Sequence, residues 1–196
     1  SFLAYVIGIP LGIILVVTDA DGIKPIPVLQ KVLGLIINLL RSVPFIILLI
    51  MMIPVTRAIM GTTLGAKAII PPLVAAAAPY IARMVESSFK EVDPGVIEAA
   101  QSMGATTWQI IWKVLLPEAK PSLLVGAAIS ITTVLGYSAM SGFVGGGGLG
   151  NIAINYGYYR YETEMMLVTV VILVVIVQII QETWMKLSKI SDKRIR

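Results

Sequence analysis

The sequence predicts an all-α membrane protein, and three observations support this fold class. The chain of 196 residues is 57% hydrophobic and only 13% charged, and its mean hydropathy is +0.91. These values lie outside the range of soluble globular domains. The apolar residues also form runs of roughly 20 residues, which is the length of a helix that crosses a bilayer core about 30 Å thick.

Five such runs predict five transmembrane helices, which together form a single domain over residues 1–196. The first run, 1–18, contains a proline that a membrane helix can tolerate. Because the chain begins with Ser1 and not with methionine, we expect that an N-terminal segment is missing.

The remaining four runs differ in their polarity. The second, 33–56, includes Arg41 and two prolines, so its uncharged part begins only after this arginine. The third, 68–89, contains Pro71, Pro72 and Pro79. The fourth, 119–141, starts a long uncharged stretch that continues through a glycine cluster, and the fifth, 164–185, is rich in Val and Ile.

The distribution of basic residues predicts how the chain is oriented. Five spans place the two ends on opposite sides of the membrane. If the C-terminus is cytoplasmic, that side receives Lys24, Lys31, Arg83, Lys90, Lys113, Lys120, Lys186, Lys189, Lys193, Arg194 and Arg196. The other side keeps only Arg57, Lys67 and Arg160. The positive-inside rule therefore predicts an N-terminus outside and a C-terminus in the cytoplasm.

The residue inventory excludes most enzyme chemistry. The chain has no cysteine and no histidine, which rules out thiolate or imidazole metal sites, nucleophile pairs with histidine and disulfide frameworks. The net charge of +4 is small and fits membrane orientation better than nucleic-acid binding. We expect no catalytic, cofactor-binding or metal-binding residue in this chain.

The loop 90–117 interrupts the apolar pattern with helix-punctuating residues. Asp93 has the position of an N-cap, and the proline after it suits the first helical position. Gly104 predicts a helix stop, and Thr106 with Gln109 has the spacing of a capping box. We expect a helix, a glycine turn and a second helix that ends with the loop, all in the cytoplasm.

Two interpretations of this loop are open from its pattern. An amphipathic hairpin could rest on the lipid headgroups, but such a helix should carry bulky apolar and basic residues. The first helix instead carries the sequence EAAQS at 98–102. Small side chains with one carboxylate favour close approach by another protein.

The same loop resembles the EAA loop of permease subunits of bacterial ATP-binding-cassette importers. That pattern is EAA, three residues, G, nine residues and I-x-L-P. Here Glu98-Ala99-Ala100 is followed at the same spacing by Gly104 and by the sequence VLLP at 114–117, with Val114 in place of isoleucine. Further stretches resemble the methionine-importer branch: RSVPFIILL at 41–49, APYIARMVE at 78–86, GYSAMSGFVGGGGLG at 136–150 and YGY at 156–158.

This resemblance implies a type I importer core of five helices that works as a homodimer in the bacterial inner membrane. It implies two cytoplasmic ATPase subunits, which bind ATP and Mg, and an extracytoplasmic substrate-binding protein. In that family the EAA loop is a coupling helix that docks on the ATPase. The resemblance therefore assigns ATPase docking to Ile97, Glu98, Ala99, Ala100, Met103 and Gly104.

The implied function is uptake of methionine or a related amino acid by alternating access. An importer of another small polar solute is the nearest alternative, and an ion channel or a membrane scaffold belongs to a different class. An intramembrane protease would need a paired catalytic set, which is not evident. By the resemblance, Tyr137, Ser138 and Met140 line or close the translocation pathway, whereas ordinary helix packing is the simpler interpretation of each.

Three other features have simple interpretations. The glycines at 145–148 lack the Lys-Ser/Thr of a phosphate-binding loop, so we expect a flexible external connection. A carbonyl-lined pore filter is also conceivable there. Arg41 is expected near the cytoplasmic end of its span, and Arg83 is expected to pair with Glu86 three residues later.

Overall fold

The computed structural model describes residues 1–192, and every regular element among them is a helix. The all-α class is thus confirmed for this part of the chain. Lys193, Arg194 and Arg196 of the predicted basic tail lie outside the described residues. The elements are α1 (Phe2–Val17), α2 (Pro27–Ser42), α3 (Phe45–Met51), α4 (Ile53–Met60), α5 (Ile70–Lys90), α6 (Pro94–Ser102), α7 (Thr107–Ile110), a π-helical turn Ile111–Leu115, α8 (Leu116–Ala139), a 3₁₀ turn Met140–Val144, α9 (Gly148–Ile152), a second π-helical turn Ala153–Tyr158 and α10 (Thr163–Ser191).

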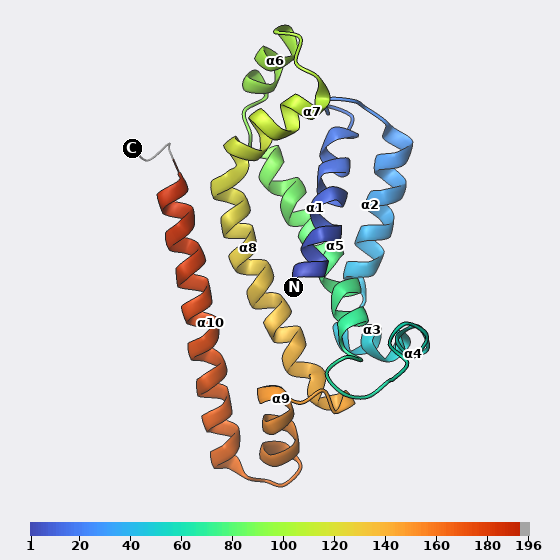
Figure 1. Ribbon diagram of the computed structural model, residues 1–196, viewed down its shortest axis with the longest axis vertical. Helices are drawn as coiled ribbons and strands as arrows, with labels where there is room; N and C mark the ends of the chain where they lie inside the picture. The colour runs from blue at the N-terminus through green and yellow to red at the C-terminus, as the bar shows by residue number, and fades with distance from the viewer. Residues whose placement is uncertain (193–196) are drawn as a thin grey trace.

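The long helices α1, α2, α5, α8 and α10 run roughly along the long axis of the molecule (Figure 1). Helix α6 and the short helix α7 lie at one end, here called the α6 end. Helices α3, α4 and α9 lie toward the other end, here called the α9 end. Helix α5 leads toward the α6 end, and α8 returns from it.

Four of the five expected runs coincide with single helices. Helices α1, α5 and α8 match the runs 1–18, 68–89 and 119–141 to within three residues at either end. Helix α10 begins where the run 164–185 predicts but continues to Ser191.

The expected second run, 33–56, is wrong as a single helix. The chain forms α2, bends by 100° and continues as α3 and then α4. Val43 has an extended backbone, with φ −81° and ψ 122°, because the ring of Pro44 disfavours helical geometry in the residue before it. Helix α4 restarts with a proline in its first turn.

Length and apolar composition identify fewer spans than the five expected. Within residues 1–192, the segments Thr107–Val144 and Thr163–Ser191 are each long and apolar enough to cross a membrane. The bent pair α2 and α3 is a third candidate if it counts as one broken span. Helix α1 is apolar but has only 16 residues.

Helix α5 is the centre of the packing. It contacts α1, α2 and α8, and its buried residues join the largest apolar cluster. Two glycines let α1 approach it closely, because a Cβ atom at Gly8 would lie 2.7 Å from Ile81 and one at Gly12 would lie 2.6 Å from Val85. Glycines four residues apart on one face are a common device for close helix packing in membranes.

The two arginines near the expected spans have different outcomes. Arg83 pairs with Glu86 at 2.6 Å, as predicted. Arg41 lies in the last turn of α2, which runs away from the α6 end (Figure 1). The expectation that it lies at the same end as the loop 90–117 is therefore wrong. Its guanidinium stands over the ring of Tyr80, 5.7 Å from the ring centroid.

Candidate coupling helix and its surroundings

Helix α6 projects at the end of the molecule and begins with the cap that the sequence predicts. The Oδ1 atom of Asp93 accepts a hydrogen bond of 2.8 Å from the backbone N–H of Gly95. Pro94 occupies the first helical position, where the missing N–H costs nothing. The start of α6 is thus fixed by residues adjacent in the sequence.

Gly104 ends α6 in the left-handed conformation, with φ 77°. The N–H of Gly104 donates to the carbonyl of Gln101, and the N–H of Ala105 donates to the carbonyl of Ala100. This pair of bonds is a Schellman motif, which satisfies the last carbonyls of the helix and favours glycine at this position. The predicted glycine turn is confirmed.

The capping box after the turn is also present. Thr106 accepts from the backbone N–H of Gln109 at 3.4 Å, and the Gln109 side chain accepts from the backbone N–H of Thr106 at 2.8 Å. The predicted end of this helix at Pro117 is wrong. Helix α7 continues through a π-helical turn into α8. This turn lies directly before Pro117, whose ring and missing N–H disturb regular α-helical hydrogen bonding but do not end the helix.

The residues that the resemblance assigns to docking do not share one face. Glu98, Ala99, Met103 and Gly104 are exposed, and Met103 is 81% exposed. Ile97 packs partly against the core, and Ala100 is buried within it. Ala100 is therefore an anchor of α6 in this chain and has no free surface to offer.

Sequence reasoning missed several exposed side chains of this region. Val96 lies three residues before Ala99, on the same side of α6, and is exposed. Trp108 and Trp112 are also exposed, and their ring centroids are 5.4 Å apart. The spacing of four residues between the two tryptophans, in a predicted helix, was a signal that could have found this pair.

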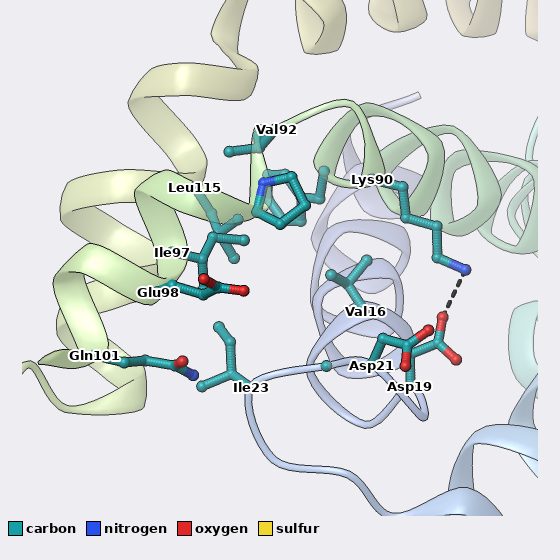
Figure 2. A pocket seen from close by; sticks show the side chains of 13 residues that line it. Val16, Asp19, Asp21, Ile23, Lys90, Val92, Ile97, Glu98, Gln101 and Leu115 are labelled. Carbon is teal, nitrogen blue, oxygen red and sulfur yellow. Dashed lines mark ion pairs between the residues drawn. The ribbon is translucent and has the colours of Figure 1, made fainter.

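A cavity of about 450 Å³ separates α6 from the connection between α1 and α2. Figure 2 shows Glu98 and Gln101 of α6 on one side and Asp21 and Ile23 of the connection on the other. Glu98 is exposed and borders this cavity, and Val96, Ala99 and Met103 are also exposed.

An ion pair closes one side of this cavity. Lys90 Nζ lies 2.6 Å from Asp19 Oδ2 and 3.1 Å from Glu86 Oε1, and Figure 2 marks the first of these contacts. Hydrogen bonding to Lys90 lowers the pKa of Asp19 below its ordinary value. Hydrogen bonding to Asp19 likewise raises the pKa of Lys90. Both groups therefore remain charged across the physiological pH range.

The predicted pathway residues lie far along α8 from this loop, next to the 3₁₀ turn. The Tyr137 ring stacks on Phe45 of α3, with centroids 4.8 Å apart and planes 9° apart. The Ser138 hydroxyl donates to the carbonyl of Leu135, and Met140 is exposed. Tyr137 thus joins α8 to α3, and Met140 is free for contact outside the chain.

The described residues show no metal-binding arrangement. No group of three or more His, Cys, Asp or Glu side chains in residues 1–192 is placed to hold a metal ion. The glycines at 145–148 connect the 3₁₀ turn to α9, and three of the four have positive φ.

Comparison with known sequences gives a consistent result. The family model described as "binding-protein-dependent transport system inner membrane component" matches residues 8–189. The chain is 50% identical over 190 residues to the probable D-methionine transport system permease protein MetI of Vibrio cholerae, covering 97% of this chain and 84% of that protein. It is 43% identical over 165 residues to the methionine import system permease protein MetP of Bacillus subtilis, covering 84% of this chain and 74% of that protein.

Comparison with solved structures agrees. The structure of the MetNI methionine ABC transporter in an inward-facing conformation matches with a TM-score of 0.96 and 47% identity, covering 98% of this chain and 89% of that chain. The crystal structure of an amino acid ABC transporter with histidines matches with a TM-score of 0.74 and 23% identity, covering 96% and 87%. The second match supports the fold alone. The chain belongs to the family of inner-membrane components of binding-protein-dependent transport systems.

Proposed function

We propose that this chain is the permease subunit of an ATP-binding-cassette importer that takes up methionine or a related amino acid by alternating access. Two relatives that cover most of the chain are named as methionine permeases, and a methionine transporter has nearly the same fold. The chain is a transporter subunit and not an enzyme. ATP and Mg bind to the partner ATPase, which supplies the energy.

The observation that carries this proposal is the geometry of α6. Its inner side is fixed by Ala100 in the core, and its outer side presents Val96, Ala99 and Met103 to the surroundings. A short, capped helix that exposes small and apolar side chains together with the Glu98 carboxylate fits a cleft in a protein partner. In the assembly of two permeases and two ATPases, each α6 docks on one ATPase.

The proposed topology has five spans, with the α6 end in the cytoplasm. The spans are α1, the broken unit of α2, α3 and α4, then α5, α8 and α10. The elements near the α6 end carry Lys24, Lys31, Lys90, Lys113, Lys120, Lys186 and Lys189, whereas Arg41, Arg57, Lys67 and Arg160 lie away from this end. This asymmetry supports an N-terminus outside and a C-terminus inside.

The exposed Met140 supports a gate at the α9 end of a homodimer. Two copies of this apolar side chain, one from each permease, close the pathway by contact with each other. Tyr137 holds this part of α8 against α3 by stacking on Phe45. The Ser138 hydroxyl forms a hydrogen bond within α8, to the carbonyl of Leu135. Replacing Met140 with alanine should raise passive leak of methionine through the reconstituted transporter, and an unchanged leak would assign Met140 to packing.

Reconstitution tests the function. Proteoliposomes that hold the permease and the ATPase should transport labelled methionine only when two conditions are met. ATP must be present on the side of the membrane that holds the ATPase, and the substrate-binding protein must be present on the opposite side. Uptake of a different small polar solute in place of methionine would overturn the substrate, and passive ion current without the partners would overturn the importer.

A docking variant tests the role of α6. Met103→Asp places a charge on a side chain that is 81% exposed, so folding should be unaffected while ATPase association weakens by roughly tenfold or more. Glu164→Gln, near the start of α10 and far from α6, is a control for a general effect of altered surface charge. Normal association of Met103→Asp would contradict the docking assignment.

A further inference from the structure

A row of charged side chains joins three parts of the chain near the α6 end. Glu86 lies at its centre and is 5% exposed. Its Oε2 atom is 2.6 Å from Arg83 Nη1, and its Oε1 atom is 3.1 Å from Lys90 Nζ. Lys90 also contacts Asp19 at 2.6 Å. Both oxygens of the buried carboxylate are thus occupied, and the row reaches the connection that follows α1.

Arg83 extends the row to α2. Its Nη2 atom donates to the carbonyl of Gly34 at 3.1 Å and to Oδ1 of Asn38 at 3.0 Å. A Cβ atom at Gly34 would lie 3.3 Å from Arg83 Nη2, so glycine gives the guanidinium room to approach the backbone. The planar guanidinium can hold several acceptors in fixed directions, which a lysine ammonium does not do equally well.

The helix that carries this row is directly connected to the coupling helix. Only residues 91–93 separate α5 from α6. Val92 in this connection is buried in the same apolar cluster as Phe89 of α5 and Ala100 of α6. A displacement of α6 is therefore transmitted to the end of α5 through packed side chains and not through a flexible linker.

We propose that Arg83, Glu86 and Lys90 are positioning residues for transport, which make α1, α2 and α5 move as one body when α6 is displaced. The inference rests on the proposed function, because it concerns how force from the ATPase spreads within the permease. Without these contacts, α5 would still follow α6, but the α1–α2 connection and α2 would be held to it only by apolar packing.

The burial of Glu86 explains why the row resists separation. A buried ion pair adds little net stability compared with apolar packing, but removing one partner leaves a buried charge that costs several kcal/mol. Moving α2 away from α5 removes the two contacts that Arg83 makes to α2. Moving the α1–α2 connection away leaves Lys90 with Glu86 alone. Either movement takes hydrogen-bonded groups apart, so the row favours concerted motion.

The measurement that tests this inference is the amount of methionine taken up per ATP hydrolysed in the reconstituted complex. Lys90→Met and Arg83→Met should lower this ratio by roughly three- to tenfold. ATP hydrolysis by the complex should continue, because the permease residues are not part of the ATPase. Lys186→Met is the matched control, because Lys186 is exposed on α10 and its ion-pair partner Glu182, 4.0 Å away, is on the same helix. This variant should take up as much methionine per ATP hydrolysed as the unaltered complex.

A double-mutant cycle separates positioning from a general loss of stability. If Asp19 and Lys90 act through their contact, the variant with both Asp19→Asn and Lys90→Met should lose no more than the more impaired single variant. Losses that multiply would show that the two residues act independently. Arg83→Lys keeps the charge and should recover part of the ratio that Arg83→Met loses.

The outcomes distinguish this inference from the function it rests on. If the unaltered complex takes up methionine with ATP and the Arg83 and Lys90 variants keep its uptake per ATP, the inference is overturned and the function stands. If the unaltered complex shows no ATP-dependent uptake, the proposed function fails first. Assembly is judged by size-exclusion chromatography with the ATPase. Variants that do not assemble are replaced by Asp19→Asn, which alters a partly buried partner of Lys90 and leaves the Arg83–Glu86 contact in place.

Discussion

Helices α5 and α10 are both long, but they have opposite surroundings. Ten of the 21 residues of α5 are buried, whereas α10 buries only Thr169 and Ser188 of its 29 residues. The exposed residues of α10 are mostly large apolar side chains, such as Val171 and Ile179, each 61% exposed. Helix α5 instead combines small residues with the charged pair of Arg83 and Glu86.

The difference between α5 and α10 shows that hydropathy identifies helices that contact lipid better than helices that are surrounded by other helices. A helix in contact with lipid must be apolar on its outer face, and α10 meets every criterion of an apolar span. A helix surrounded by other helices can contain prolines, alanines and paired charges, because protein groups satisfy them. Helix α5 is less apolar than a typical lipid-facing span, although it is the helix against which α1, α2 and α8 pack.

The largest expected effect is at the contact of α5 with α1. Gly12→Val would place a Cβ atom 2.6 Å from Val85 Cβ and 2.7 Å from the carbonyl oxygen of Ala82. Backbone cannot yield as a flexible side chain does, so the substitution should destabilise the folded permease by about 3 kcal/mol or prevent its folding. The yield and melting temperature of the detergent-solubilised protein would measure this.

Gly136→Ala is the matched control in α8. A Cβ atom at Gly136 meets no atom within 4 Å, and alanine is the better helix former by about 0.5–1 kcal/mol. This variant should be as stable as the unaltered protein or slightly more stable. If Gly12→Val were equally harmless, α5 would not be the packing centre that the structure indicates.

The second largest effect is expected where α6 ends, at Gly104. Gly104→Ala adds one methyl group in open space, so any effect comes from φ 77°, which costs an L-residue about 1 kcal/mol. The substitution should loosen the Schellman motif, and ATPase association and methionine uptake should both fall severalfold. The protein should remain in the membrane.

Gly65→Ala gives a comparison for the same kind of strain away from α6. Gly65 has φ 89° and open space around it, and it lies between α4 and α5. Its replacement should cost similar stability without weakening ATPase association. Equal loss of association in both variants would show that strain alone, and not the shape of α6, determines docking.

The helix caps and the glycine turn of the loop 90–117 could be predicted from sequence because their hydrogen-bond partners are close in sequence. Asp93, Gly104 and Thr106 each act within three or four residues of themselves, so a single stretch of sequence contains all the partners. The positions of α1, α5, α8 and α10 followed from apolar runs for the same reason. Local chemistry therefore predicted where α6 starts and ends, but it did not predict that α7 continues into α8 or that α10 extends to Ser191.

The orientation of side chains around α6 could not be predicted in the same way. Whether Ala100 faces the core and Glu98 faces the cavity depends on the rotation of α6 against α5 and the α1–α2 connection. These neighbours are distant in sequence. The bend after Ser42 is a similar case, because Pro44 marks a break, but its angle of 100° depends on packing of α3 against α5.

A smaller effect is expected for the ion pair that ties the α1–α2 connection to α5. The pKa of Asp19 is lowered in the folded protein, so its contribution is present above the ordinary pKa of 3.8 and is lost as the pH falls through the folded value. The pKa of Lys90 is raised, so its contribution is present below the ordinary value and is lost as the pH rises through the folded one.

The lowered pKa of Asp19 predicts the pH dependence of Asp19→Asn. The variant should melt slightly below the unaltered protein throughout about pH 5–9, because exposed ion pairs contribute at most about 1 kcal/mol. The difference should shrink as the pH falls below 3.8 and through the lowered pKa of folded Asp19, where the unaltered protein also loses the charge. Thermal melting of the two proteins side by side over this range would measure it. A difference that persisted in acid would mean that the Asp19 carboxylate is not its source.

The smallest expected effect is in α10, and one substitution allows the two helices to be compared directly. Val171→Ala removes two methyl groups from a side chain that is 61% exposed. The variant should change the free energy of unfolding by less than about 0.5 kcal/mol. Val85→Ala removes the same groups from a buried position of α5 and should cost about 2 kcal/mol through lost contacts and a cavity. If Val171→Ala were as costly as Val85→Ala in the assembled transporter but harmless in the separate permease, this face of α10 would contact a second copy and not lipid. The comparison of α5 with α10 would then hold within one chain and fail for the assembly.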